Sequence, residues 1–542
     1  MESTADKHIR TYDSLKSDRS QLDQYYQQLA YYNLPRKAYI TRIKNMGDKI
    51  PTDIYDSTAI MSLAYFSAGM QAYMSSPQSR FFALGIKNRQ LMNNRNVLNY
   101  LKDSEDVLYG MINNSNFYQE DVESYQGIGC FGVDVLYAED DPLEDLRYDC
   151  LPIESVCIVN DHAGRTRTVY MEFEYDCEQA IGKFGQAVGE KVKEAYAKSN
   201  FSIKFKYVYC VKPRDVYDIS KMDSKNMPYE STWIDRENKR IIKESGFREF
   251  PFFISRFAKS KGDPYGYSPA MNILPDVQML NQMEHSNIVS AQNVARPPLE
   301  VPDEAFLRPF DFNPGGINIK NLGYPNEHVT PIATGGNVPV TLDYLQYKQR
   351  KVSQAFYNDL FVMMEQKGST TATEVNIVNN QRMQLLGSAV GNIMRDKLSP
   401  VISRNYAVAA RKNKLPPLPR ELIGQEYIIE YISPLARAQK FLELQNLSSA
   451  LGIIGQIGAV NPETFDKVDF DKTVDRIANI TSIAPDIIRD DGEVEEIRAN
   501  RAQAQEMAQK MAAVQQGTDI IKTGTEADKN AAQGQQASTV GR

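Results

Sequence analysis

The sequence predicts an α+β fold that is predominantly helical. Hydrophobic residues make up 42% of the chain, which is enough to bury a sizeable core. Its length of 542 residues corresponds to roughly three or four domains. Apolar residues recur at helical spacing over positions 1–125 and again beyond Tyr265. Between these regions, β-branched and aromatic residues gather in short runs that are typical of strands.

Three helices are expected in the N-terminal part. Apolar and aromatic residues recur over 12–32, and Pro35 closes this segment. The cluster Asp56–Thr58 offers N-cap side chains for a second helix, which ends at the Ser-Ser-Pro sequence of 75–77. A third, more amphipathic helix is expected over Arg95–Asn113.

The middle of the chain is expected to form an α+β unit in which a helical insert interrupts a set of strands. The residue pattern changes from helical to strand-like around Gly127. The helical insert covers Cys177–Lys198, so the order is not a strict βαβ repeat. Asp161-His162 precedes Ala163-Gly164 and is interpreted as a hairpin tip rather than a catalytic pair. The expected strands are Val133–Tyr137, Ser155–Val159, Thr168–Tyr175, Ile203–Val211, Tyr229–Ile234 and Phe252–Phe257.

Two long helices are expected after Tyr265. The first covers Ser268–Val294, with Pro275 in its early turns. A span rich in Pro and Gly follows over 294–339, and a second helix covers 341 to about 366. Two long helices on either side of an irregular excursion indicate a protruding hairpin.

Further helices are expected in the C-terminal part. Gly368-Ser369-Thr370 breaks the second long helix, and the capping-box sequence of 371–374 starts another that runs to about Lys412. Gly387, Gly391 and Pro400 are its expected kink points. Later helices are expected over 435–452, 461–467, 470–480 and 493–516, followed by a disordered tail.

Composition and motifs argue against several function classes. The net charge of -7 differs from the basic footprint of a protein that grips nucleic acid, so contact with DNA is expected to be local or weak. The sequence has no Walker A, GxSxG, HExxH or GxGxxG motif, and its four histidines lie far apart. Adjacent carboxylates such as Asp140-Asp141 and Asp490-Asp491 are interpreted as turn residues. We therefore expect no enzymatic activity, no cofactor and no metal.

The sequence also bears on the compartment. Five cysteines without a CxxC pair indicate reduced thiols buried as small hydrophobic residues. No apolar run is long enough to span a bilayer, and residues 1–10 do not resemble a signal peptide. We expect a protein of a cytoplasm-like compartment without a membrane partner.

A series of short motifs is distributed over roughly residues 8 to 480. The motifs are Asp56-Ser57-Thr58-Ala59 through Ser76-Pro77 and Phe82-Ala83-Leu84, then Phe131–Tyr137, Pro264–Ala270 with Leu274-Pro275-Asp276 and Leu280-Asn281, Arg296–Leu299, Thr371–Val375 and Ser433–Gln439. In this order they resemble the portal, or head-to-tail connector, proteins of short-tailed (podovirus-type) bacteriophages. Phe82 stands where the family often has Trp and keeps an aromatic anchor.

This resemblance implies a ring, usually of twelve copies, at one vertex of the capsid. DNA would enter through the ring during packaging and leave through it during ejection. The implied parts are a wing over 1–267, a first stem helix over 268–293, a clip over 294–340, a second stem helix over 341–365, a tunnel loop over 366–371, a wing return helix over 372–432, a crown over 433–492, a candidate barrel helix over 493–520 and a disordered tail over 521–542.

The stem and tunnel loop hold the candidate DNA-channel residues. The first stem helix has no Lys or Arg, whereas the second carries Lys348, Arg350 and Lys351. A lumen with few charges suits sliding, and one cation repeated by rotational symmetry becomes a ring of modest field. The alternative is a solvated helix face paired with acidic residues of the same segment, Asp343, Asp359 and Glu365. The tunnel-loop candidates are Gln366, Lys367, Gly368, Ser369 and Thr370, and their alternative is a plain linker between helices.

The resemblance also implies the partners. They are further copies of the chain, double-stranded DNA, the terminase large subunit, the major capsid protein, the scaffold and a tail adaptor protein. The implied location is the portal vertex of the virion, with the host cytoplasm during assembly. Two rival functions remain open: another head or tail structural protein, such as an adaptor or core protein, and a DNA-processing enzyme.

Overall fold

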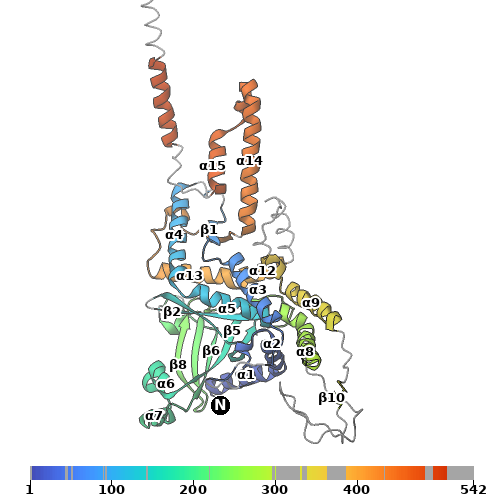
Figure 1. Ribbon diagram of the computed structural model, residues 1–542. Coiled ribbons are helices and arrows are strands. Elements are labelled where there is room, and N and C mark those ends of the chain that lie inside the picture. The colour runs from blue at the N-terminus through green and yellow to red at the C-terminus, as the bar shows by residue number, and fades with distance from the viewer. Residues whose placement is uncertain are drawn as a thin grey trace, which may run out of the picture. The chain divides into compact units, whose positions relative to one another are not determined.

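The computed structural model describes residues 3–42, 47–49, 53–88, 91, 94–141, 144–218, 220–221, 223–295, 299–300, 330–331, 338–362, 386–432, 434–481 and 492–508. The chain divides into two compact units, Met1–Ala438 and Gln439–Arg542, and each is described by itself. The first unit combines many helices with antiparallel sheets, which confirms the predicted α+β class (Figure 1).

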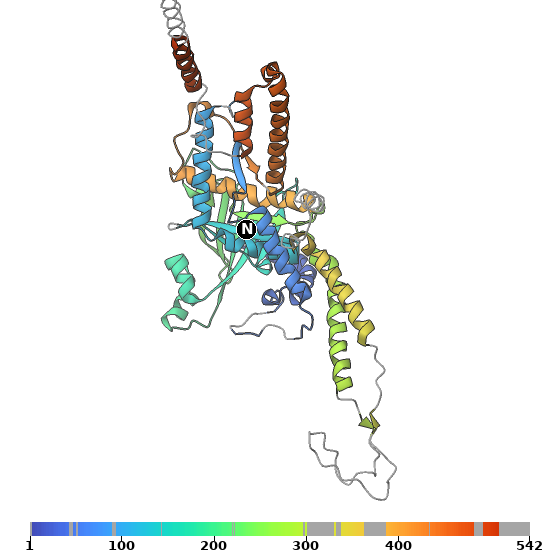
Figure 2. The same ribbon diagram turned by 45° about the horizontal axis from the view of Figure 1, so that its top comes forward.

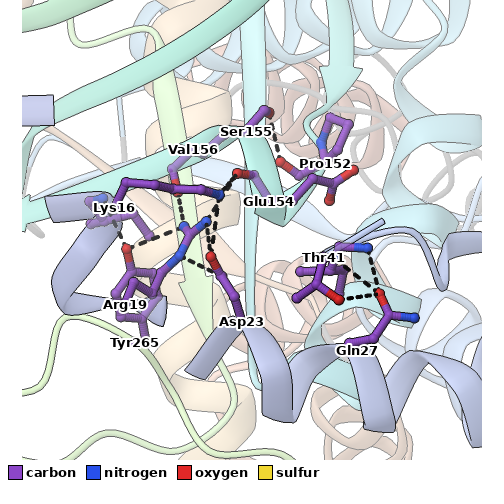
Figure 3. Close-up of polar contacts among 12 residues, drawn as sticks. Lys16, Arg19, Asp23, Gln27, Thr41, Pro152, Glu154, Ser155, Val156 and Tyr265 are labelled. Atoms are coloured by element: carbon purple, nitrogen blue, oxygen red, sulfur yellow. Dashed lines mark hydrogen bonds and ion pairs between the residues drawn. The ribbon is translucent and has the colours of Figure 1, made fainter. Parts of the chain in front are cut away.

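The first predicted helix is in fact two helices, α1 (Thr4–Asp18) and α2 (Ser20–Asn33). At the break between them, the side chain of Arg19 turns inward and is 1% exposed. Its Nε donates to Asp23 Oδ1 at 2.8 Å, and its terminal nitrogens donate to the carbonyls of Glu154 and Val156 (Figure 3). The start of the chain is thereby fixed to the start of a strand, a contact that helical spacing could not reveal.

Three helices follow in the N-terminal region: α3 (Thr58–Met74), α4 (Arg95–Asn114) and α5 (Phe117–Phe131). The first two match the predicted positions, whereas α5 was not predicted. It ends at Gly132, whose left-handed φ of 78° suits glycine. A Cβ at Gly132 would lie 2.6 Å from the backbone of Tyr267, so only glycine fits between the helix and the strand that follows.

The largest sheet is antiparallel, with strand order β4-β5-β6-β7-β8. The predicted strands of this region are confirmed, and β8 was missed. The hairpin tip predicted at Asp161-His162 is also confirmed, because Asp161 Oδ1 accepts from the backbone N–H groups of Ala163 and Arg165. The strands are β4 (Val156–Asn160), β5 (Thr166–Tyr175), β6 (Phe205–Pro213), β7 (Tyr229–Asp235) and β8 (Arg240–Phe247).

Helices cover this sheet. Helix α1 lies against the sheet (Figure 1). Its Ile9 and Tyr12 form one buried cluster with Tyr170, Val208 and Ile234 of the strands. The predicted insert is split at Gly185 into α6 (Cys177–Phe184) and α7 (Glu190–Ala197). Of the five cysteines, Cys150 is partly exposed and the other four are buried, and all are free thiols, as predicted.

The described residues also form three smaller sheets. One has the order β3-β2-β9, from β2 (Val133–Asp141), β3 (Asp145–Cys150) and β9 (Phe252–Arg256). Another pairs β1 (Phe82–Ile86) with β12 (Tyr427–Tyr431). The last pairs β10 (Leu299–Glu300) with β11 (Thr330–Pro331). Of these strands, β2 and β9 were predicted.

The helix predicted from 371 to about Lys412 is described from Gly387 onward and consists of α12 (Gly387–Ile393), a π-helical turn (Met394–Leu398) and α13 (Ser399–Arg411). The irregular turn precedes Pro400, which lacks the N–H that would bond to the carbonyl of Asp396. The turn directs Lys397 into the core. Its Nζ lies 2.5 Å from Asp121 Oδ1, and both side chains are 0% exposed.

The second unit is helical. It contains most of α14 (Pro434–Val460), α15 (Phe470–Thr481) and a helix over 492–508. These helices agree with the predicted 435–452, 470–480 and 493–516, although α14 is longer. Arg498 makes two hydrogen bonds of 2.7 Å with the carboxylate of Asp471, which joins the last helix to α15. The predicted disordered tail lies outside the described residues.

Candidate nucleic-acid interface

The predicted helical hairpin is present as α8 (Pro269–Ala295) and α9 (Val338–Ala355), which lie side by side (Figure 2). Helix α8 buries Ile273, Val277 and Leu280, the first part of the predicted apolar face. Farther along this face, Ile288 is 37% exposed. The hairpin is therefore anchored at one end, and its other end carries exposed apolar side chains.

The anchored end is fixed to α3 and to the segment before it by side-chain hydrogen bonds. Gln349 Nε2 donates to Asp56 Oδ2 at 2.9 Å. The backbone N–H of Tyr55 donates to Asn281 Oδ1 at 2.7 Å. Asp56 also accepts from the N–H of Thr58 at the start of α3, so the predicted N-cap cluster connects α3 with the second helix of the hairpin.

Two of the candidate channel cations form a clamp across the hairpin. The ammonium groups of Lys348 and Lys351 each lie 2.7 Å from a different oxygen of Asp276 on α8. These hydrogen bonds lower the pKa of Asp276 and raise that of Lys348. The acidic partner of both lysines is therefore Asp276 on the other helix, whereas Glu365, one of the three carboxylates considered in the sequence, lies outside the described residues.

Arg350 differs from its two neighbours. It is exposed, and it has no ion pair with another residue in the described part of the chain. It lies in a polar recess whose lining residues are Gln346, Gln349, Arg350, Ser353, Gln354 and Asp359. Of the three cations, Arg350 is the one most available to a phosphate, because its guanidinium is exposed. Lys348, in contrast, is only 9% exposed.

The second helix ends earlier than predicted. It stops at Ala355, and Tyr357 has a left-handed φ of 59° before the short helix α10 (Asn358–Val362). The ring of Phe361 in α10 lies over Gly69 of α3, where a Cβ would come within 2.3 Å of the ring. This contact fixes the chain just before the predicted tunnel loop. Gln366, Lys367, Gly368, Ser369 and Thr370 lie outside the described residues.

The described residues also bear on other kinds of site. They contain no group of three or more His, Cys, Asp or Glu side chains placed to hold a metal ion. No helix among them is long and apolar enough to cross a membrane.

Comparison with known proteins gives the family. A family model described as bacteriophage head to tail connecting protein matches residues 5–488. The chain belongs to this family. This connector is 28% identical over 518 residues to a probable portal protein of Bordetella phage BPP-1, covering 93% of this chain and 92% of the relative. It is also 28% identical over 531 residues to the portal protein of Salmonella phage epsilon15, covering 96% and 95%.

Two residues that shape the connector's hairpin were missed in the sequence. Asp276 was quoted only as part of a motif, although it is one of two carboxylates in α8, the other being Glu284. Because α8 has no Lys or Arg and lies opposite a helix with three cations, one of its two carboxylates could have been expected to pair with those cations. Tyr25, whose hydroxyl donates to the carbonyl of Met271 in α8, left no such signal.

Proposed function

We propose that the chain is a phage portal protein, a non-enzymatic ring that conducts double-stranded DNA through one capsid vertex. The observation that carries this proposal is the match to portal proteins over nearly the whole length of the chain and of both relatives. The helical hairpin, anchored at one end and exposed at the other, suits a stem that packs against further copies of itself. The comparisons favour this function over an adaptor, a core protein or a DNA-processing enzyme.

The proposed parts follow the hairpin. Helices α8 and α9 form the stem, the span between them the clip, residues 366–371 the tunnel loop and 372–432 the wing return helix. The wing is 1–267, the crown 433–492, and the helix of 492–508 begins the barrel. The proposed partners are eleven further copies, DNA, the terminase large subunit, the major capsid protein, the scaffold and a tail adaptor. The proposed location is the virion vertex, after assembly in the host cytoplasm.

The decisive experiment is native mass measurement with end-on electron images of the full chain. Twelve copies of the 61.4-kDa chain give about 740 kDa and a ring with a central hole. A particle of another architecture, or a chain that stays monomeric even with its scaffold and capsid proteins, would contradict the proposal.

Within this proposal, Arg350 is the main lumen cation of the stem. Arg350→Glu is expected to reduce the amount of DNA packaged while rings still form, because it reverses a charge that is free to meet phosphates. Lys348→Glu would instead place a carboxylate beside Asp276 and disturb the hairpin. Normal packaging by the Arg350→Glu variant would exclude a role for Arg350 in the channel.

Deletion of 366–371 is expected to block late packaging and to leave ring assembly unchanged.

A further inference from the structure

A second charged site lies away from the hairpin. A cavity of about 570 Å³ lies beside the tip of the β4–β5 hairpin, next to β9 and the π-helical turn of the return helix. We call it the hairpin-tip pocket. Its charged lining residues are Arg165, Arg167, Arg256, Lys259, Arg395 and Asp396.

The pocket has an excess of positive charge. Five cationic side chains share one lining carboxylate, Asp396, which pairs with Lys259 and lies 3.1 Å from Arg395 Nε. Asp161 lies just outside, 3.9 Å from Arg167 Nε. A larger cavity of about 620 Å³ between β2, the main sheet and α13 also has five cationic residues, but four carboxylates offset them. Charge therefore distinguishes the hairpin-tip pocket.

Arg256 carries the strongest signal. It is 3% exposed, and one terminal nitrogen donates to Asn160 Oδ1 at 3.1 Å and to Thr166 Oγ1. Its Nε, also buried, has no hydrogen-bond partner in the described part of the chain. An unpartnered donor on a buried cation costs free energy, and a negative charge held in the adjoining pocket would offset the positive charge of this guanidinium.

The pKa values agree with this geometry. Burial lowers the pKa of Arg256 and of Lys259, and Asp396, joined by Asp263 in the case of Arg256, offsets this only in part. The positive charge of Arg395 lowers both values further. A bound anion would relieve this mutual repulsion.

We propose that the hairpin-tip pocket binds a phosphate group, either of a free phosphate or of a DNA backbone. Guanidinium groups match phosphate oxygens with paired hydrogen bonds. A free phosphate carries roughly -1.5 to -2 charges at neutral pH, and a DNA backbone brings one negative charge on each successive phosphate, so either supplies more charge to this excess of cations than a single carboxylate would. The side chains of Arg167 and Arg395 are 48% and 69% exposed, so they form the entrance, and Arg256 forms the base. This inference does not rest on the portal function.

The test compares the full chain with two double variants that each lose two positive charges. Arg167→Gln with Arg395→Gln removes the entrance of the pocket. Lys198→Gln with Lys204→Gln is the matched control, because both lysines are exposed and neither lines the pocket. Inorganic phosphate and pyrophosphate are titrated by calorimetry, a short DNA duplex is followed by fluorescence anisotropy, and thermal unfolding checks that every variant is folded.

We expect pyrophosphate to bind the wild-type chain with a Kd below about 1 mM. The pocket variant should bind at least about tenfold more weakly, and the control variant should bind as the wild type does. A parallel loss of duplex binding would identify the DNA backbone as the source of the phosphate, and a loss confined to the small anions would identify a free phosphate. Absence of binding by both small anions, or equal losses in both variants, would overturn the proposal.

Discussion

Pro275 illustrates how one residue in α8 depends on a distant one. Proline has no N–H, so the carbonyl of Met271, four residues earlier in α8, has no partner inside the helix. The hydroxyl of Tyr25 in α2 donates to this carbonyl at 3.2 Å. The sequence indicated where the proline would be tolerated, but the partner that satisfies the carbonyl is about 250 residues away and becomes visible only in three dimensions.

Replacement of Tyr25 by Phe should therefore destabilise the first unit. The variant keeps the ring and leaves the Met271 carbonyl unpaired, and we expect a loss of about 1 kcal/mol in the free energy of unfolding. Denaturant unfolding measures this loss. Tyr32→Phe is the control, since no hydrogen bond of the Tyr32 hydroxyl to the described residues is found. Equal effects of the two variants would contradict the role of Tyr25.

Loss of one partner from the buried pair of Lys397 and Asp121 is expected to cost more stability than loss of the Tyr25 hydroxyl. Besides the carboxylate, the ammonium of Lys397 donates to Ser124 Oγ at 2.7 Å and lies 3.9 Å from the centroid of the Tyr125 ring. Lys397→Met should destabilise the first unit by about 3–5 kcal/mol, because it leaves the carboxylate of Asp121 buried without its cation.

A double variant separates the pair from simple packing. Asp121→Asn combined with Lys397→Met removes both charges, and we expect it to be more stable than Lys397→Met alone. The measurement is again the free energy of unfolding. If the second substitution lowered stability further, the loss would have to come from packing and not from an uncompensated charge.

At the scale of elements, the close contact between α3 and α10 fixes the chain just before the predicted tunnel loop. Gly69→Ala would place a methyl group inside the space of the Phe361 ring. We expect it to destabilise the chain by about 1–3 kcal/mol and to speed hydrogen exchange in 358–362. Gly110→Ala in α4 is the matched control, because its Cβ would meet nothing within 4 Å, and it should be neutral or stabilising by about 0.5–1 kcal/mol.

The clamp across the α8–α9 hairpin makes the stability of the first unit depend on pH. The pKa of Asp276 in the folded chain is below its ordinary value near 3.8, because Lys348 and Lys351 bond to the carboxylate. The clamp is therefore complete above about pH 5, weakens as the pH falls below about 4 and is lost once the carboxylate is protonated.

Asp276→Asn tests this dependence. We expect it to lower the free energy of unfolding by about 1 kcal/mol near pH 7, with a difference from wild type that narrows between about pH 4 and pH 3. Asp343→Asn is the control, because Asp343 is exposed and has no ion pair with another described residue. A difference that stays constant with pH would exclude the carboxylate as its source.

Most elements could be predicted from local patterns, and those that could not have a physical reason. The β-branched runs located β5, β6 and β7, whereas β8 was missed because its sequence, with Lys243 and Glu244 among exposed positions, has little apolar alternation. Helix α5 was missed because Gly127 and Gly129 suggested a break. These glycines instead allow close packing, since a Cβ at Gly129 would come within 2.6 Å of Leu63.

At the scale of the whole molecule, the sequence located the helical hairpin but not its internal pairing. Helical spacing placed the two helices over nearly their observed ranges. Charge counting grouped Lys348, Arg350 and Lys351 together. The structure separates them. Asp276 pairs with Lys348 and Lys351, which lie 72 and 75 residues farther along the chain, and Arg350 is left available.

The pairing of β1 with β12 has a consequence for the order of synthesis. Phe82 is opposite Tyr431, so the first strand has no partner until nearly the entire first unit has been made. At about 5–20 residues per second, a ribosome needs on the order of 20 to 70 seconds to add the intervening chain. During that interval Phe82 and Leu84 lack the strand that later pairs with β1. A nascent chain that has not reached Tyr431 cannot complete this part of the fold, which makes closure of the β1–β12 pair a late step in the folding of each newly made subunit.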